Sequence, residues 1–194
     1  MKKTFKILTL ALFLLVSLNS RANDGIDLKV GDQQYLLVSL SKVEKGALLS
    51  LLGENKEIIY KDRILEEDSI TRKFDFNGLP DGEYTLKLDR EFHISTSVIT
   101  KIKDKLIINY RSNLLIFKPL YRGDEDQVSV YLANPEKNRV EIKIFDKFGV
   151  PVGILTCNDL VIKKKLDFSE VPPGNYTVQI KTKTNNFTKT LVVG

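Results

Sequence analysis

A pattern of 15 residues occurs twice in this chain, as FDFNGLPDGEYTLKL at residues 74–88 and as LDFSEVPPGNYTVQI at residues 166–180. The two segments are 92 residues apart, and Gly31-Asp32 is repeated as Gly123-Asp124 at the same offset. An offset of this size is too long for a solenoid repeat and suits a small domain. We therefore expect two tandem copies of one fold.

The segments around this pattern alternate between apolar and polar side chains. Residues 36–42, 128–134 and 140–145 are apolar at every second position, which is the period of a half-buried β-strand. Such strands recur roughly every 8–12 residues between turn signals, a spacing typical of a sandwich or barrel. The sequence predicts an all-β protein of two tandem immunoglobulin-like, Greek-key β-sandwich domains.

We place domain 1 at residues 23–110 and domain 2 at residues 111–194. KLIINY and NLLIFKP read as two strands separated by Arg111-Ser112, without a Pro/Gly/Ser-rich linker. A tight junction follows from this composition. The alternative is a single barrel closed by both copies.

Each residue of the repeated pattern has a role in folding. The Phe is large enough to anchor a small core, the Pro holds its neighbour extended, and the Gly supplies the positive φ of a type II turn. The Tyr hydroxyl can bond back to a loop as in a tyrosine corner, and Asn77 and Ser169 can bond their own backbone to start the turn. These structural positions are Asp75, Phe76, Pro80, Gly82 and Tyr84 in the first copy and Asp167, Phe168, Pro172, Gly174 and Tyr176 in the second.

Residues 1–22 have the features of a cleaved signal peptide. A basic start is followed by an apolar run over residues 7–18, and Ser20 and Ala22 are small residues suited to cleavage after Ala22. The alternative is an uncleaved N-terminal anchor. No later segment is apolar enough to span a membrane, so we expect an exported protein.

Without residues 1–22, 26 basic and 25 acidic residues remain, a net charge of +1, which argues against a nucleic-acid partner.

Few side chains in the chain suit catalysis or metal binding. There is one histidine, one cysteine and no tryptophan, so a His/Cys zinc site within one chain is excluded. His93 alternates with apolar residues, and we expect it to lie exposed with Ser95 and Ser97 on a polar strand face. We expect Cys157 to be a buried free thiol. The sequence therefore predicts a protein that is not an enzyme and that has no cofactor or metal.

The turn RGDEDQ, residues 122–127, allows two further interpretations. Its three acids suit a Ca²⁺ site, and its first three residues are a tripeptide that some adhesion receptors bind. Because Gly31-Asp32 occurs at the equivalent place, we favour an acidic solvated turn. Carbohydrate binding is a further alternative, since seven Tyr and ten Phe remain as platforms.

The second copy resembles the C-terminal sorting domain of proteins exported by the type IX secretion system. The resemblance spans about thirty residues and follows D-[FL]-S-x-[LV]-P-x-G-x-Y-x-[LV], and a small exported sandwich family, the DUF3244-like proteins, is also similar. The resemblance to the sorting domain implies a β-sandwich that engages the secretion machinery. Ser69, in Asp68-Ser69-Ile70, looks like the acceptor for protein O-glycosylation in bacteria that have this secretion system. The matching positions are Asp167, Phe168, Ser169, Val171, Pro172, Gly174, Tyr176 and Val178.

Three hypotheses for function follow. The first is a non-enzymatic adhesion, scaffold or assembly protein that binds a protein partner or cell-surface component through sandwich edges or loops. The second is a type IX secretion substrate with a C-terminal sorting signal. The third is an enzyme of unrecognised type. We expect the periplasm, the cell surface or the extracellular medium as its location.

Overall fold

The computed structural model describes residues 25–66, 68–123 and 126–194. The predicted signal peptide and two acids of the predicted acidic turn, Asp124 and Glu125, therefore lie outside the described residues. These three ranges form 15 β-strands and one short 3-10 helix, η2 (Asp32–Gln34), so the predicted all-β class is confirmed. No helix in the described ranges is long and apolar enough to cross a membrane.

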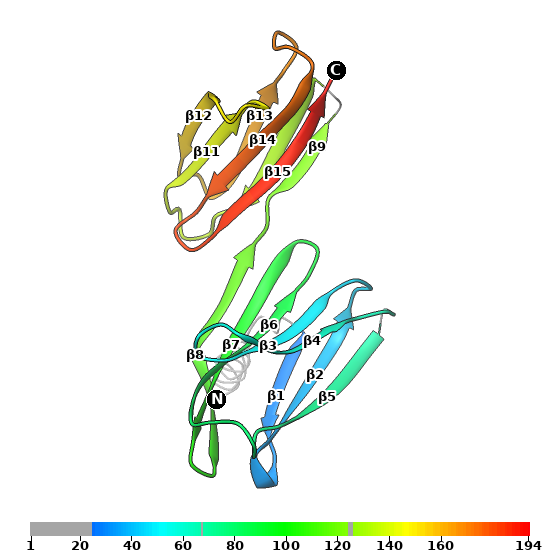
Figure 1. Ribbon diagram of the computed structural model, residues 1–194, viewed down its shortest axis with the longest axis vertical. Coiled ribbons are helices and arrows are strands. Elements are labelled where there is room, and N and C mark those ends of the chain that lie inside the picture. Colours follow the sequence, from blue (N-terminus) through cyan, green and yellow to red (C-terminus); the bar gives the residue numbers. More distant parts are fainter. Residues whose placement is uncertain (1–24, 67, 124–125) are drawn as a thin grey trace, which may run out of the picture.

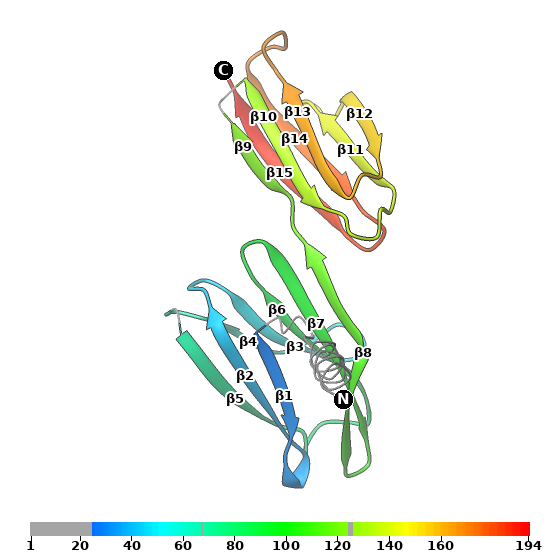
Figure 2. The ribbon, with the colours of Figure 1, turned by 180° about the vertical axis from the view of Figure 1, so that it is seen from behind.

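The strands form four antiparallel sheets, two in each half of the chain (Figure 1). In the N-terminal half, β1-β2-β5 faces β4-β3-β6-β7-β8, and in the C-terminal half, β13-β10-β9 faces β12-β11-β14-β15 (Figure 2). We call these halves the N-terminal and the C-terminal sandwich. The strands are β1 (Ile26–Val30), β2 (Tyr35–Val43), β3 (Leu48–Leu52), β4 (Ile58–Arg63), β5 (Asp68–Asp75), β6 (Gly82–Asp89), β7 (His93–Ile102), β8 (Lys105–Phe117), β9 (Leu120–Gly123), β10 (Gln127–Ala133), β11 (Val140–Phe145), β12 (Pro151–Cys157), β13 (Val161–Asp167), β14 (Gly174–Lys181) and β15 (Asn186–Val193).

Each sandwich encloses its own apolar cluster. Phe76 is fully buried in the N-terminal cluster, and Phe168 holds the same place in the C-terminal one. Each ring packs against the tyrosine of the same motif, with centroids 5.2 Å apart for Phe76–Tyr84 and 5.3 Å apart for Phe168–Tyr176. The repeated aromatic pair therefore lies at the centre of both cores, as the size of these side chains leads one to expect.

The strand orders of the two sandwiches correspond except for β8, but their register differs from a uniform shift of the sequence. Leu88 of β6 and Ile180 of β14 hold the same place in their sheets and are 92 residues apart. Their neighbours Leu49 and Ile142 are 93 residues apart. A gapless shift of 92 would place Leu49 on the wrong face of β11, because a slip of one residue reverses every side chain of a strand.

Strand β8 differs from the predicted arrangement of the junction. It is one strand, Lys105–Phe117, and it pairs with β7 along both of its halves. The predicted break at Arg111-Ser112 is instead an irregularity within this pairing, opposite the Thr96–Val98 step. Leu106 packs in the N-terminal core, whereas Phe117 packs against the C-terminal core. The predicted division at residues 110 and 111 therefore falls inside a strand, at a point where residues 110–113 have no partners in β7 but the residues on both sides of them do.

The predicted polar face of residues 91–97 is wrong. Ser95 and Ser97 are only 3% and 4% exposed, and His93 is half-buried. The two serines pair with the core leucines of β6, and β8 covers the other edge of β7. Cross-strand neighbours lie on the same face of a sheet, so the serines face inward although their side chains are polar.

Candidate interaction edges

The aspartate of each corner motif, rather than the following Asn or Ser, initiates the turn. Asp75 Oδ1 accepts hydrogen bonds from the backbone N–H of Asn77 at 2.9 Å and from its Nδ2 at 2.8 Å. Asp167 Oδ1 accepts from the N–H and Oγ of Ser169 at 3.0 and 2.7 Å. These bonds lower the pKa of Asp167. The short Asp side chain reaches the backbone two residues ahead, as in an Asx turn.

The tyrosine of each motif closes the same corner. The Tyr84 hydroxyl donates to the Pro80 carbonyl at 2.6 Å, and the Tyr176 hydroxyl donates to the Pro172 carbonyl at 2.8 Å. The sequence predicted this return bond. The glycines have φ of 153° and 154°, which is positive as expected but far from the roughly +80° of a type II turn. All these contacts serve the corner itself.

Other predicted positions lie far apart in the fold. Cys157 is a buried free thiol, as predicted, and burial raises its pKa. Ser69 is exposed on β5, and its O-glycosylation stays a prediction. Arg122 and Gly123 of the adhesion tripeptide belong to β9. Across the described ranges, no three His, Cys, Asp or Glu side chains gather in a way that could hold a metal ion.

The junction between the sandwiches is held by the turn after β6. The Lys118 ammonium lies 2.5 Å from both the Asp89 carboxylate and the Arg90 carbonyl, and the Lys118 N–H donates to the Phe92 carbonyl at 2.8 Å. Burial opposes ionisation of Asp89, but its bonds and charge interactions with Lys118 and Lys87 outweigh burial, so the pKa of Asp89 is lowered. These contacts attach the connecting segment to the N-terminal sandwich.

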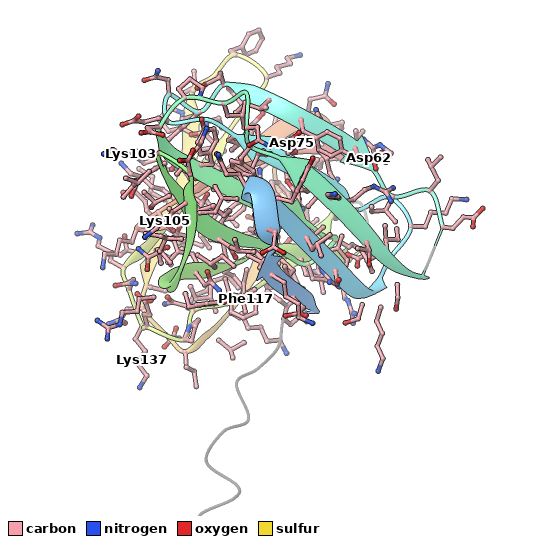
Figure 3. All side chains as sticks on the ribbon, turned by 90° about the horizontal axis from the view of Figure 1, so that it is seen from below. Asp62, Asp75, Lys103, Lys105, Phe117 and Lys137 are labelled. Atoms are coloured by element: carbon pink, nitrogen blue, oxygen red, sulfur yellow. The ribbon has the colours of Figure 1, made fainter. Side chains whose placement is uncertain are left out.

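Two of the sheet edges carry charges that discourage pairing with another strand. In β13 three consecutive lysines, Lys163–Lys165, follow the edge, as the sequence indicated. In β4 the edge carries Lys61, Asp62 and Arg63. Asp62 also accepts two hydrogen bonds from Arg72 of β5, at 2.9 and 3.1 Å, on the side where β5 ends the facing sheet (Figure 3). Charges of this kind protect natural edge strands.

The edge strand β12 has no such protection. Residues 148–158, FGVPVGILTCN, contain no charged side chain. Val152 and Ile154 are 51% and 59% exposed, and Phe148 in the preceding turn is 79% exposed. The sequence alone did not predict this edge. The uncharged run was visible in the sequence, but its position at the margin of a sheet was not.

A second free edge belongs to β15. In the N-terminal sandwich, β8 covers the corresponding edge of β7, whereas the sheet β12-β11-β14-β15 ends at β15. Phe187 and Lys189 hold the places of Ser95 and Ser97, and they are half-buried and exposed, respectively. Among the described strands of the C-terminal sandwich, none takes the place of β8. The backbone of β15 is therefore available on one side.

The chain is thus an all-β protein with sandwich architecture, and in its C-terminal half one sheet has an uncharged edge at β12 and an unpaired edge at β15. Residues 124–194 match the family described as the secretion system C-terminal sorting domain. The match begins after β9 and includes β10 to β15. It implies an exported protein that interacts with the type IX secretion machinery. No curated protein matches the sequence significantly.

Three solved structures are similar to this chain at low sequence identity and low TM-score. A biofilm-associated protein BSP domain is 11% identical with a TM-score of 0.31, over 87% of this chain and 29% of that one. The human OSCAR ligand-binding domain is 10% identical with a TM-score of 0.25, over 87% of this chain and 96% of that one. A β-glucuronidase from an uncultured Clostridium sp. is 11% identical with a TM-score of 0.29, over 87% of this chain and 34% of that one. The chain therefore spans about a third of the first and third of these proteins.

Proposed function

We propose that this protein is a non-enzymatic substrate of the type IX secretion system and that its C-terminal sandwich is the sorting signal. The match of residues 124–194 to the sorting-domain family carries this proposal. The predicted signal peptide at residues 1–22 agrees with it, because a protein sorted at the outer membrane must first leave the cytoplasm. The N-terminal sandwich is then the exported passenger.

The geometry of the C-terminal sandwich supports such a role. It has an apolar core of its own, built from β10 to β15 with Tyr121 and Phe117 packed against it. The free edge of β15 exposes backbone groups to which a receptor strand can add. Recognition of this kind needs a folded sheet and an accessible edge, and no catalytic side chain.

The test uses a passenger protein fused in front of either sandwich in a bacterium with a type IX system. We expect fusions to residues 117–194, which keep the Phe117 that packs against this core, to reach the cell surface or medium. Fusions to residues 23–117 are the matched control, because they contain the same corner motif at Asp75–Tyr84 without the family match. Immunoblots of periplasm, surface and medium locate the passenger. Retention of the first fusion in the periplasm would refute the sorting role.

A second role, binding of another strand at a sheet edge, is favoured by the uncharged margin of β12. This was our first hypothesis from the sequence, and an adhesion or assembly protein would use such an edge without special residues. The role does not compete with export, because β12 and β15 lie at opposite ends of one sheet. A protein whose export depends on recognition of β15 is able to bind another strand at β12 after export.

We also infer that the two sandwiches are copies of one immunoglobulin-like fold, related to the DUF3244-like proteins. Their strand orders correspond, with β1-β2-β5 matching β9-β10-β13 and β4-β3-β6-β7 matching β12-β11-β14-β15. The tyrosine corner also lies at the start of the strand that carries it in immunoglobulin-like folds. Superposition of the sandwiches in a crystal structure tests this inference, and failure of most Cα positions to superpose would contradict it.

A further inference from the structure

Strand β12 offers a surface that neither sorting nor the corner motifs use. It is the last strand of its sheet, with β11 on one side. We propose that two copies of this chain associate by pairing their β12 strands antiparallel across a twofold axis. The two four-stranded sheets would then form one sheet of eight strands. This inference goes beyond the sorting role and does not depend on it.

Self-pairing is favoured at β12 by the absence of charge. In a twofold interface the same residues from both copies meet, so a charge near the axis faces its own like charge. Three lysines of β13 would meet three lysines of the mate. Residues 148–158 contain no charge, so β12 itself brings no like charges to the axis.

Comparison with β4 supports this interpretation. Leu49 pairs with Asp62 of β4, and the corresponding Ile142 pairs with Leu155 of β12. By the same ladder, Ile154 holds the place of Lys61, and Thr156 holds the place of Arg63. The same edge is thus charged in one sandwich and uncharged in the other, within a single chain.

The geometry of β12 also limits where the second copy can pair. Pairing with β11 is regular from Val140–Cys157 to Ile144–Gly153, and an irregularity follows at Phe145–Pro151. Pro151 has no N–H to donate, and a bulge bends a strand away from a neighbour. The regular segment Gly153–Cys157 is therefore the part available to the mate, with exposed Ile154 and Leu155 at its centre.

Five residues from each copy bury less than the roughly 800 Å² per partner of a standard interface. We therefore expect a weak dimer that forms as the protein concentration rises. In the cell, local concentration on a surface or in an export complex would favour it. A permanent dimer would require a larger apolar area than β12 and the preceding turn provide.

Sedimentation velocity of the chain beginning at Asn23, over a hundredfold range of concentration, tests the proposal. We expect a concentration-dependent dimer that Ile154→Lys abolishes, because this change gives β12 the residue that β4 has at the same place. Ile58→Lys is the control, since Ile58 is an equally exposed residue on the β4 edge at 60% exposure, and the dimer should be unchanged. Circular dichroism confirms that both variants remain folded.

Hydrogen exchange provides a second readout that does not depend on a substitution. Every second backbone N–H group of residues 153–157 points away from β11, and these groups should become more protected as concentration rises, whereas those of β13 should not. A monomer at every concentration would overturn the proposal, as would a dimer that persists in Ile154→Lys. Protection of β12 only after an exported partner is added would also overturn it, and would assign the edge to that partner. None of these outcomes bears on the passenger fusions.

Discussion

The corner bond of Tyr176 gives a quantitative prediction about the C-terminal sandwich. The Tyr176 hydroxyl donates to the Pro172 carbonyl at 2.8 Å, and its ring, 5% exposed, packs against Phe168. Tyr176→Phe keeps the ring and removes the hydroxyl, so no cavity forms. The loss is therefore that of one hydrogen bond, a net ~1 kcal/mol.

The surroundings keep the loss near this value. Pro172 is exposed, so water can reach its carbonyl after the substitution, and the full cost of an unpaired buried acceptor does not apply. For a domain of this size, a loss of ~1 kcal/mol lowers the melting temperature by about 4–8 °C. Tyr84→Phe should have a similar effect on the N-terminal sandwich, where the corresponding bond is 2.6 Å long.

Calorimetry and urea unfolding of the chain beginning at Asn23 measure both effects. The control is Tyr110→Phe, because the Tyr110 ring is exposed and its hydroxyl is 3.4 Å from the Leu28 carbonyl, at the long limit of a hydrogen bond. We expect this variant to melt within about 2 °C of the parent. A loss above about 3 kcal/mol for Tyr176→Phe would refute the reasoning, because it would show that the ring has moved. No loss at all would refute the corner bond.

Three further predictions follow from single sites. Because the pKa of Asp89 is lowered, its pairing with Lys118 adds stability at pH values above the unfolded pKa of ~3.9, and this stability is lost as the pH falls through the folded pKa. In urea unfolding at a series of pH values, the free energy of unfolding of Lys118→Ala should therefore fall less steeply toward acid pH than that of the parent. Burial and the raised pKa of the Cys157 thiol should make it react slowly with a disulfide reagent at pH 8 until the chain unfolds. Gly174→Ala should cost ~1–3 kcal/mol because of its φ of 154°, whereas Gly78→Ala, at an open site without positive φ, should cost none.

Each of these predictions has an outcome that contradicts it. An acid limb that is unchanged in Lys118→Ala would show that the ion pair at the junction contributes no stability. Equal reaction rates of the native and unfolded thiol would show that Cys157 is accessible. A Gly174→Ala protein as stable as its parent in urea would show that the backbone at this position can change its φ without cost.

Local patterns in the sequence were sufficient to predict the strands and the corners. Alternation in residues 36–42 and 128–134 predicted β2 and β10, because a strand with one buried face has a period of two. The Pro, Gly and Tyr of the repeated pattern predicted a turn with a returning hydroxyl bond, since those residue types restrict the backbone within a few positions. These features depend on neighbours in the chain, and the sequence contains them.

The tertiary structure alone decided which polar residues face inward and which strands end a sheet. Ser95 and Ser97 are buried because of their partners in β6, and one strand continues past the expected break because residues 105–109 and 114–117 both pair with β7. The uncharged run at residues 148–158 matters for binding only because β12 is the edge strand of its sheet. Pairing between distant segments sets these properties, and no local pattern records which strand will have a neighbour and which will have none.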